Sequence, residues 1–186
     1  MSKGWVKLKH ALVIGGTGML ARASVWLSEN GYHVSVIGRN AEKMQVLLDE
    51  NPTRMTPVMV DYTNLVELVD QLRRIQNEHG PIELVVAWIH STGQHVLPCL
   101  IESFSHSQPW KLFQVSGSSL NLQEIKDRLA IPTHVSYHQI QLGFKIESGN
   151  SRWLTHAEIS NGVIQSILEE KPEQVIGIIE PRENRP

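Results

Sequence analysis

Short runs of apolar residues alternate along the chain with longer stretches in which apolar residues recur every three or four positions. The short runs predict strands buried on both faces, and the longer stretches predict helices with one apolar side. The predicted strands are Leu12–Ile14, His33–Ile37, Met55–Val60, Leu84–Ala87, Trp110–Val115, Val135–Phe144 and Val175–Ile179. The predicted helices are Met19–Asn30, Ala41–Glu50, Asn64–His79, His95–Glu102, Leu120–Leu129 and Thr155–Glu169, the last with a Thr155–Glu158 capping box.

This alternation predicts an α/β fold. Strands that alternate with helices form a parallel sheet, and right-handed connections place the helices on both of its faces. The length of 186 residues suits one compact domain. We therefore expect a single domain over residues 1–186, with a doubly wound parallel sheet of about seven strands in three α/β/α layers, the Rossmann arrangement.

Glycines cluster where the first predicted strand passes into the first predicted helix. The segment reads Gly15-Gly16-Thr17-Gly18-Met19-Leu20-Ala21. Glycines let a phosphate approach the backbone closely, and the free N–H groups and positive end of the helix attract it. The spacing Gly16-x-Gly18-x-x-Ala21 matches the dinucleotide fingerprint. We expect this loop to hold a dinucleotide pyrophosphate, and a tight turn without a ligand is the alternative.

The end of the second predicted strand indicates which dinucleotide is bound. An acidic residue at this place binds the ribose of NAD, whereas an arginine accommodates the 2′-phosphate of NADP. The acidic position holds Gly38, and Arg39 follows it. The pattern favours NADP over NAD, unless Arg39 is an ordinary surface residue. After the third predicted strand, Asp61 either accepts a hydrogen bond from adenine or forms an Asx turn before Asn64.

Together these segments resemble the short-chain dehydrogenase/reductase family over nearly the whole chain. Residues 152–159 also look like the late helix of atypical members. The resemblance implies that the loop from Gly15 through Leu20 holds the pyrophosphate, that Arg39 holds the 2′-phosphate and that Asp61 holds adenine. By position, we add Tyr62 and Ala87 to the expected cofactor contacts. The resemblance also implies a possible homodimer.

The usual catalytic pair of that family is missing from this chain. Family members carry a Tyr-x-x-x-Lys pair in which tyrosine delivers a proton and lysine lowers its pKa. None of the three tyrosines of this chain has a lysine four residues later. The residues four positions after Tyr32, Tyr62 and Tyr137 are Val36, Val66 and Gln141, respectively. Ser116, Ser118 and His90 follow the predicted strands at the edge where substrates bind, so they are the candidate catalytic residues. Alternatively, the serines form a turn and helix cap, and His90 is structural or faces solvent.

Composition and charge narrow the possible partners. The formal charge is −2 and there is no long basic run, so nothing in the sequence suggests electrostatic capture of nucleic acid. The lone Cys99 forms no internal disulfide, and we expect its thiol to be buried and inert. The histidines form no converging set of metal ligands. The N-terminal segment has Lys3 and Lys7 but no long apolar stretch, and no segment is long enough to span a membrane, so we expect a cytoplasmic protein.

Two functions agree with these features. The first is an atypical NADP(H)-dependent oxidoreductase that acts on a small carbonyl or alkene. The second is a non-catalytic NADP(H)-binding sensor or regulatory protein, which the missing Tyr-x-x-x-Lys pair favours. The substrate is an unknown small molecule.

Overall fold

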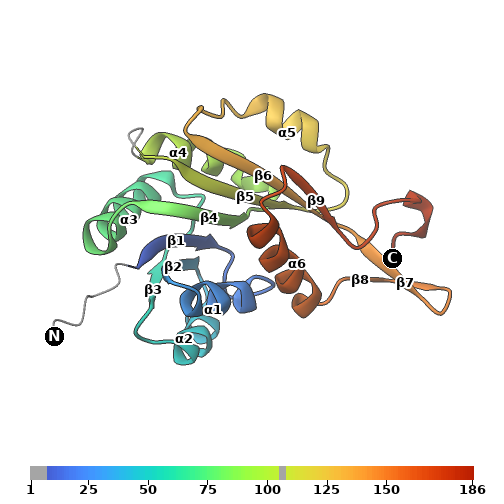
Figure 1. The fold of residues 1–186 in the computed structure, drawn as a ribbon, viewed down its shortest axis with the longest axis horizontal. Coiled ribbons are helices and arrows are strands. Elements are labelled where there is room, and N and C mark those ends of the chain that lie inside the picture. The colour runs from blue at the N-terminus through green and yellow to red at the C-terminus, as the bar shows by residue number, and fades with distance from the viewer. Residues whose placement is uncertain (1–7, 105–107) are drawn as a thin grey trace.

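A seven-stranded parallel sheet forms the centre of the protein in the computed structural model, which describes residues 8–104 and 108–186 (Figure 1). The strand order is β3-β2-β1-β4-β5-β6-β9, and every neighbouring pair is parallel. The strands are β1 (Lys9–Ile14), β2 (Tyr32–Gly38), β3 (Met55–Met59), β4 (Ile82–Trp88), β5 (Trp110–Ser116), β6 (Val135–Leu142) and β9 (Glu173–Ile176). The predicted doubly wound α/β fold with about seven strands is confirmed.

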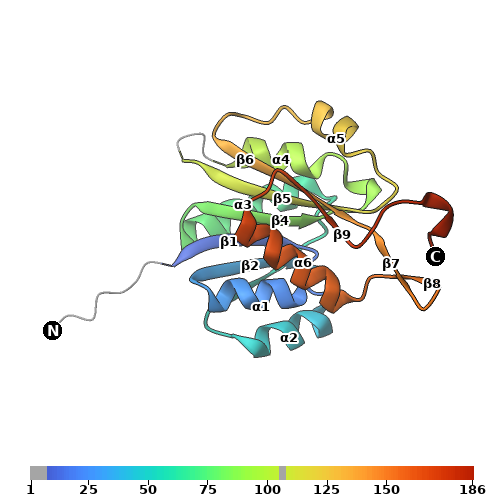
Figure 2. The same ribbon diagram turned by 45° about the vertical axis from the view of Figure 1, so that its right-hand side comes forward.

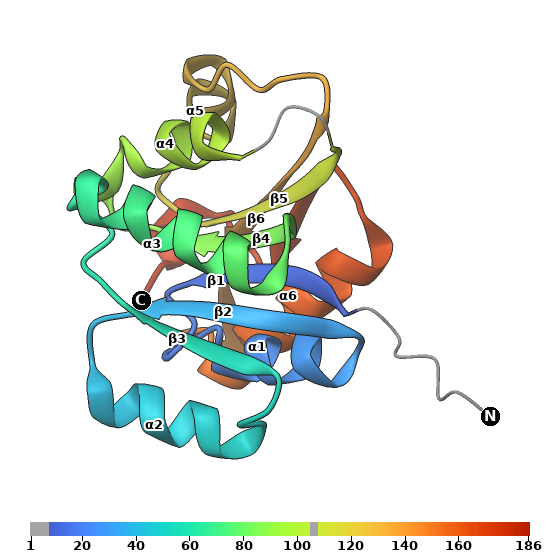
Figure 3. The same cartoon turned by 90° about the vertical axis from the view of Figure 1, so that its left-hand side faces the viewer.

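Helices cover both faces of this sheet (Figures 2 and 3). They are α1 (Ala21–Glu29), α2 (Ala41–Glu50), α3 (Leu65–His79), α4 (Val96–Ser103), α5 (Leu122–Arg128) and α6 (His156–Glu169), with short 3-10 turns η1 (Ser91–Gly93) and η2 (Arg182–Asn184). Each helix of the described ranges is too short or too polar to cross a lipid bilayer. Lys3 and Lys7 lie outside the described residues.

Alternate residues of the strands build two separate cores. Ala11 and Val13 of β1 pack on the face covered by α1, α2 and α6. Leu12 and Ile14 of the same strand pack on the opposite face, against α3 and α4. Both faces are therefore buried, which explains why the strands read as continuous apolar runs.

Several predicted strand ends differ from those in the structure, and one β-hairpin was not predicted. The sixth predicted strand was too long: β6 ends at Leu142 and is followed by Gly143, where an added Cβ atom would lie 2.0 Å from the carbonyl oxygen of Ile178. The chain then forms an antiparallel hairpin of β7 (Phe144–Glu147) and β8 (Asn150–Trp153). The predicted seventh strand, 175–179, is β9 over residues 173–176.

The hairpin also corrects the prediction for residues 152–159. Arg152 and Trp153 end strand β8, and helix α6 begins at His156. The predicted capping box is confirmed, with Thr155 as N-cap and Glu158 at the third helical position. Helix α1 begins at Ala21 and not at Met19, so residues 15–20 form a turn that precedes the helix.

The strand order places a crevice at the carboxyl ends of the strands. The chain runs outward from β1 to β2 and β3 on one side, and from β4 to β9 on the other. The order therefore reverses between β1 and β4, and ligands of open α/β sheets bind at such a switch point. The glycine segment follows β1 directly at this place.

Candidate functional site

A groove of about 620 Å³ lies at the carboxyl ends of β1, β2 and β4, and we call it the first groove. Its walls come from the glycine turn, the ends of β2 and β4, the start of α2 and the start of α6. The lining residues are Gly15, Thr17, Gly18, Met19, Ile37, Gly38, Arg39, Asn40, Lys43, Val60, Tyr62, Trp88, His90 and His156. Most of the residues predicted to bind a dinucleotide are thus brought together.

The three glycines of the turn have different roles. Gly15 has φ +79°, a backbone conformation that side chains disfavour. Gly16 is a packing position, because an added Cβ would lie 2.6 Å from Val36 Cγ1 and 2.9 Å from Ser24 Oγ. At Gly18 an added Cβ would meet no atom within 4 Å. Gly15 and Gly16 therefore set the shape of the turn, and Gly18 leaves room for a ligand beside the backbone.

The amino end of helix α1 faces this turn without an anion of its own. Its N-cap is Leu20, whose side chain has no acceptor, and its first turn contains no acidic residue. The free N–H groups and the helix dipole therefore remain available to an outside anion. The Ser160 hydroxyl of α6 donates to the carbonyl oxygen of Met19 at 2.7 Å, which fixes the far side of the turn.

Arg39 was predicted to bind the 2′-phosphate and Asp61 the adenine of one nucleotide, but in the structure the two side chains bind each other. Arg39 Nη1 donates to Asp61 Oδ2 at 3.0 Å. The other carboxylate oxygen accepts hydrogen bonds from the Thr63 N–H at 3.0 Å and the Thr63 hydroxyl at 2.7 Å, so the Asx turn is present. The Thr63 bonds and Arg39 hold the pKa of Asp61 below its ordinary value. Both oxygens of Asp61 already have donors in this structure.

Sequence reasoning missed a second cation of the first groove. Lys43 lies in the first turn of α2 and lines the groove together with Arg39. The Asn40 side chain starts this helix by accepting the Lys43 N–H at 2.8 Å. The sequence carries a signal for this position, because the N-cap residue Asn40 lies three residues before Lys43 and places this lysine in the first helical turn.

The end of β4 supplies aromatic groups to the rim. Trp88 and His90 are in an edge-to-face arrangement with ring centroids 5.9 Å apart. The His90 N–H donates to the Tyr62 hydroxyl at 3.4 Å, which links this rim to the segment after β3. His90 and Tyr62 both line the first groove, whereas Ala87 is fully buried in the sheet.

A second groove of about 330 Å³ adjoins the first. The two grooves share Met19, Trp88 and His156. The other residues of the second groove are Gly117, Ser118, Ser119, Leu142, Gly143, Trp153, Leu154 and Ile159. Ligands in the two grooves would therefore meet at the shared residues. His156 and Trp153 were not predicted as site residues, because the hairpin that brings Trp153 here was not foreseen.

The three candidate catalytic residues are not gathered at one point. Ser118 lines the second groove and His90 the first. Ser116 is only 2% exposed at the end of β5 and is not among the lining residues of either groove. The backbone carbonyl of Ser118 accepts a hydrogen bond from Arg185 Nη2 at 2.8 Å. Cys99 is half-buried, so the prediction of a fully buried thiol was wrong.

The residues present fit a phosphorylated dinucleotide better than a metal ion. The first groove combines an open glycine turn, an uncapped helix end and two cationic side chains, Arg39 and Lys43. These groups are typical of phosphate binding. Within the part of the chain that the structure describes, no three histidine, cysteine or acidic side chains are grouped to hold a metal ion.

Comparison with known sequences gives a limited match. No family model matches the chain. A protein of Myxococcus xanthus strain DK1622, described as an uncharacterized oxidoreductase, is 33% identical over 83 residues, which cover 42% of this chain and 33% of that protein. The chain thus matches about a third of the length of this curated relative.

Comparison with solved structures matches nearly the whole chain. A short-chain type dehydrogenase/reductase from Mycobacterium marinum has a TM-score of 0.70 at 16% identity, covering 91% of this chain and 93% of that one. A putative short-chain dehydrogenase/reductase from Sinorhizobium meliloti 1021 has a TM-score of 0.65 at 14% identity, covering 91% and 94%. A metagenomic short-chain oxidoreductase, solved in complex with NADP, has a TM-score of 0.65 at 11% identity, covering 93% and 97%.

Proposed function

We propose that this chain, which has the fold of the short-chain dehydrogenase/reductases, binds NADP(H) in the first groove and reduces a small carbonyl or alkene compound. NADP is named in the description of one structural relative, and an oxidoreductase is the description of the Myxococcus xanthus relative. The choice of NADP over NAD rests on this chain's own residues.

The observation that carries the proposal is the placement of Arg39 and Lys43 beside the glycine turn. A dinucleotide whose pyrophosphate lies at the amino end of α1 extends its adenosine ribose toward the end of β2. Arg39 follows β2 directly, and Lys43 lies one helical turn further along. Two cations there favour a ribose that carries a phosphate, and Asp61, the ionic partner of Arg39, is not among the residues that line this groove.

The proposed chemistry places the remaining residues at the junction of the grooves. NADPH, when bound, supplies a hydride. His90 is the proposed proton donor to the product oxygen, since its imidazole lies on the exposed rim of the first groove. Ser118 is proposed to orient the substrate from the second groove. Ser116 has a weaker claim, because its hydroxyl is buried.

A non-catalytic NADP(H) sensor is the second candidate function. The observation that favours it is the absence of a lysine four residues after any tyrosine in the chain. Tyr137 does not take the place of the catalytic tyrosine, because its hydroxyl donates to Gln114 Oε1 and burial raises its pKa far above the ordinary value. A sensor would bind the nucleotide and show no turnover.

Parallel calorimetric titrations with NADPH, NADP, NADH and NAD test the proposed function. We expect NADPH and NADP to bind at least about tenfold more tightly than NADH and NAD, since one charged hydrogen-bonded contact contributes about 1.5–3 kcal/mol. Arg39→Ala and Lys43→Ala should each reduce that preference. Arg73→Ala, which removes an exposed cation of α3 outside the first groove, is the matched control. Equal affinity for all four nucleotides, or none, would contradict the cofactor assignment.

Turnover separates the two functions. An enzyme consumes NADPH with some member of a carbonyl and alkene panel, and His90→Ala lowers that rate when NADPH is saturating. A sensor binds NADPH with the same affinity and consumes none with any compound. His95→Ala removes an exposed histidine outside both grooves and controls for a general effect of the substitution.

A further inference from the structure

We propose that the second groove binds an uncharged compound of about one aromatic ring that carries a carbonyl group, and that Trp153 is the residue that selects it. This inference rests on the proposed function, because it names the substrate class of the same site. It depends on three features of the groove: its lining, the surrounding charges and the position of the hairpin.

The lining is apolar with a few hydroxyl groups and one imidazole. Trp88, Leu142, Trp153 and Ile159 contribute most of the apolar side chains, and Ser118 is one of the polar groups. Not one of the eleven lining residues is acidic, lysine or arginine. The first groove differs sharply, since it contains two cations. An anionic group in the second groove would lose its water without gaining an ionic partner from the lining residues.

The charged side chains near the hairpin are occupied by one another. Arg152 bonds to Glu147 at 2.6 Å and to Glu158 at 2.9 Å. Lys145 bonds to Glu158 at 2.6 Å. Arg185 differs from these two cations: it donates to the carbonyl oxygen of Ser118, which is uncharged, and its buried Nε has no hydrogen-bond partner in the structure. Arg152 and Lys145 are therefore paired with carboxylates, and Arg185 is the cation that most directly tests the proposal.

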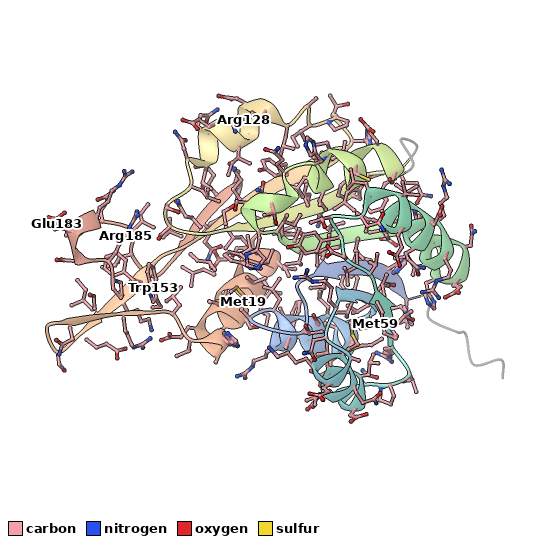
Figure 4. The ribbon with its side chains drawn as sticks, turned by 180° about the vertical axis from the view of Figure 1, so that it is seen from behind. Met19, Met59, Arg128, Trp153, Glu183 and Arg185 are labelled. Atoms are coloured by element: carbon pink, nitrogen blue, oxygen red, sulfur yellow. The ribbon has the colours of Figure 1, made fainter. Side chains whose placement is uncertain are left out.

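Trp153 is the last residue of β8, where the hairpin returns to the body of the protein. Its side chain is 51% exposed, although tryptophan is among the residues with most to gain from burial. Figure 4 shows Trp153 on the side of the molecule from which the hairpin projects, with Met19 further in. Both residues line the second groove. A flat apolar ligand in this groove covers indole surface that the fold leaves in water.

The volume sets the size of the ligand. About 330 Å³ lies at the lower end of the range for small-molecule sites, so a single-ring compound fits better than a fused or extended one. Met19, Trp88 and His156 are shared with the first groove, so a carbonyl group directed toward them lies next to that groove. The proposed substrate therefore has its reactive end at the junction and its apolar end against Trp153.

Three aromatic ketones of graded charge test this inference. Acetophenone is the uncharged probe, 4-acetylbenzoate is its anionic derivative, and 4-acetylbenzamide matches the anion in size without its charge. Binding is measured at pH 8 from the indole N–H resonances of the full chain, with and without saturating NADP. We expect acetophenone and the amide to shift the signals of Trp88 and Trp153, and the anion to bind at least about tenfold more weakly than the amide.

Variants locate the site. Trp153→Ala should weaken acetophenone binding at least about fivefold, and Trp153→Phe should restore most of it, because aromatic contact area carries the interaction. Leu168→Ala removes another exposed apolar side chain, on helix α6 and outside both grooves, and should leave binding unchanged. Unchanged chemical shifts away from the groove check that each variant is folded.

Each outcome gives a clear answer. If the anion binds as tightly as the amide and loses this affinity in Arg185→Gln, the groove selects anions and the proposal is wrong. If none of the three ketones shifts the two indole signals, it is also wrong. If the uncharged ketones bind while NADP does not, the proposed function fails and the ligand preference of the groove stands. If NADP binds and the anion is preferred, only the present inference fails.

Discussion

The imidazole rings of His33 and His79 are stacked with their centroids 3.7 Å apart. The Thr56 hydroxyl lies 2.8 Å from Nε2 of His33 and 3.0 Å from Nε2 of His79. The ring of His10 lies edge-on to both, at 6.1 and 5.6 Å. These three histidines, which we call the histidine cluster, lie at the amino ends of β1 and β2 and the carboxyl end of α3, away from both grooves.

The histidine cluster predicts that the protein loses stability as the pH falls. Burial, followed by the neighbouring histidines, lowers the pKa of His33 to about 4, and burial also lowers the pKa values of His10 and His79. In the unfolded chain these groups titrate at about 6.5, so the unfolded state takes up protons first. Their stabilising contribution is complete above pH 6.5 and is lost as the pH falls toward 4.

Thermal unfolding between pH 7.5 and 5 measures this effect. We expect the melting temperature of the unmodified protein to fall over this range, and His33→Asn to make the fall smaller. His95→Asn, in an exposed histidine remote from the cluster, should leave the slope unchanged. A slope that is identical in the unmodified protein and His33→Asn would contradict the prediction.

Alanine substitution of Gly16 and of Gly18 is predicted to affect different properties, namely stability at Gly16 and NADPH binding at Gly18. Gly16→Ala places a methyl group against Val36 and Ser24, so we expect unfolding to become easier by about 1–3 kcal/mol. Gly18→Ala adds a methyl group to open space, so stability should change by less than about 1 kcal/mol. The same methyl group occupies ligand space, so Gly18→Ala should weaken NADPH binding. Denaturant unfolding and calorimetry distinguish the two results.

The ion pair between Arg39 and Asp61 predicts that removing the carboxylate tightens NADPH binding. In Asp61→Asn, Arg39 loses its ionic partner and the nearby negative charge disappears. We expect NADPH to bind about three- to tenfold more tightly and NADH to bind as before. If Asp61 instead holds adenine through its charge, both nucleotides bind more weakly. Titrations at two salt concentrations add a check, because the gain should diminish at high salt.

Alanine substitution of Gly143 and of Gly149, both in the hairpin region, is predicted to reduce the stability of the protein by different amounts. In Gly143→Ala, the new Cβ would lie 2.0 Å from a backbone oxygen of Ile178, which cannot be relieved by a side-chain movement. We expect a loss of more than about 3 kcal/mol and exposure of the hairpin to proteolysis. Gly149→Ala has the strain of φ +80° but open space around it, so about 1 kcal/mol is expected. Chemical denaturation compares the two variants.

The sequence predicted the parallel sheet and its helices because each strand is an apolar run and each helix has one apolar side. It did not predict the hairpin, although the signal was present. Ser148 and Gly149 have φ values of 51° and 80°, as expected for a two-residue turn, and they follow the short alternating segment Phe144–Glu147. In β6, apolar residues alternate with polar ones near its end, and Phe144 follows soon after Ile140 and Leu142, so the break at Gly143 was not recognised.

The parts of the candidate site that lie within one short stretch of sequence were predictable, and the parts that depend on the packing of distant segments were not. The glycine turn and Arg39 are local, and the structure places them at one groove. The pairing of Arg39 with Asp61 and the position of Trp153 depend on how distant segments pack. The histidine cluster depends on strand register, since His10 lies directly beside His33 in the sheet. Register arises from packing of both sheet faces, and the order of residues in a single strand does not reveal it.

The bond from Ser160 to Met19 joins residues that are 141 positions apart. The glycine turn, which we propose receives the nucleotide, is therefore braced by a helix that emerges from the ribosome long after the turn itself. A nascent chain that has exposed only β1 and α1 lacks this brace, whatever its local sequence. We expect cofactor capture to be a late event in the maturation of the protein, occurring after α6 has docked against α1.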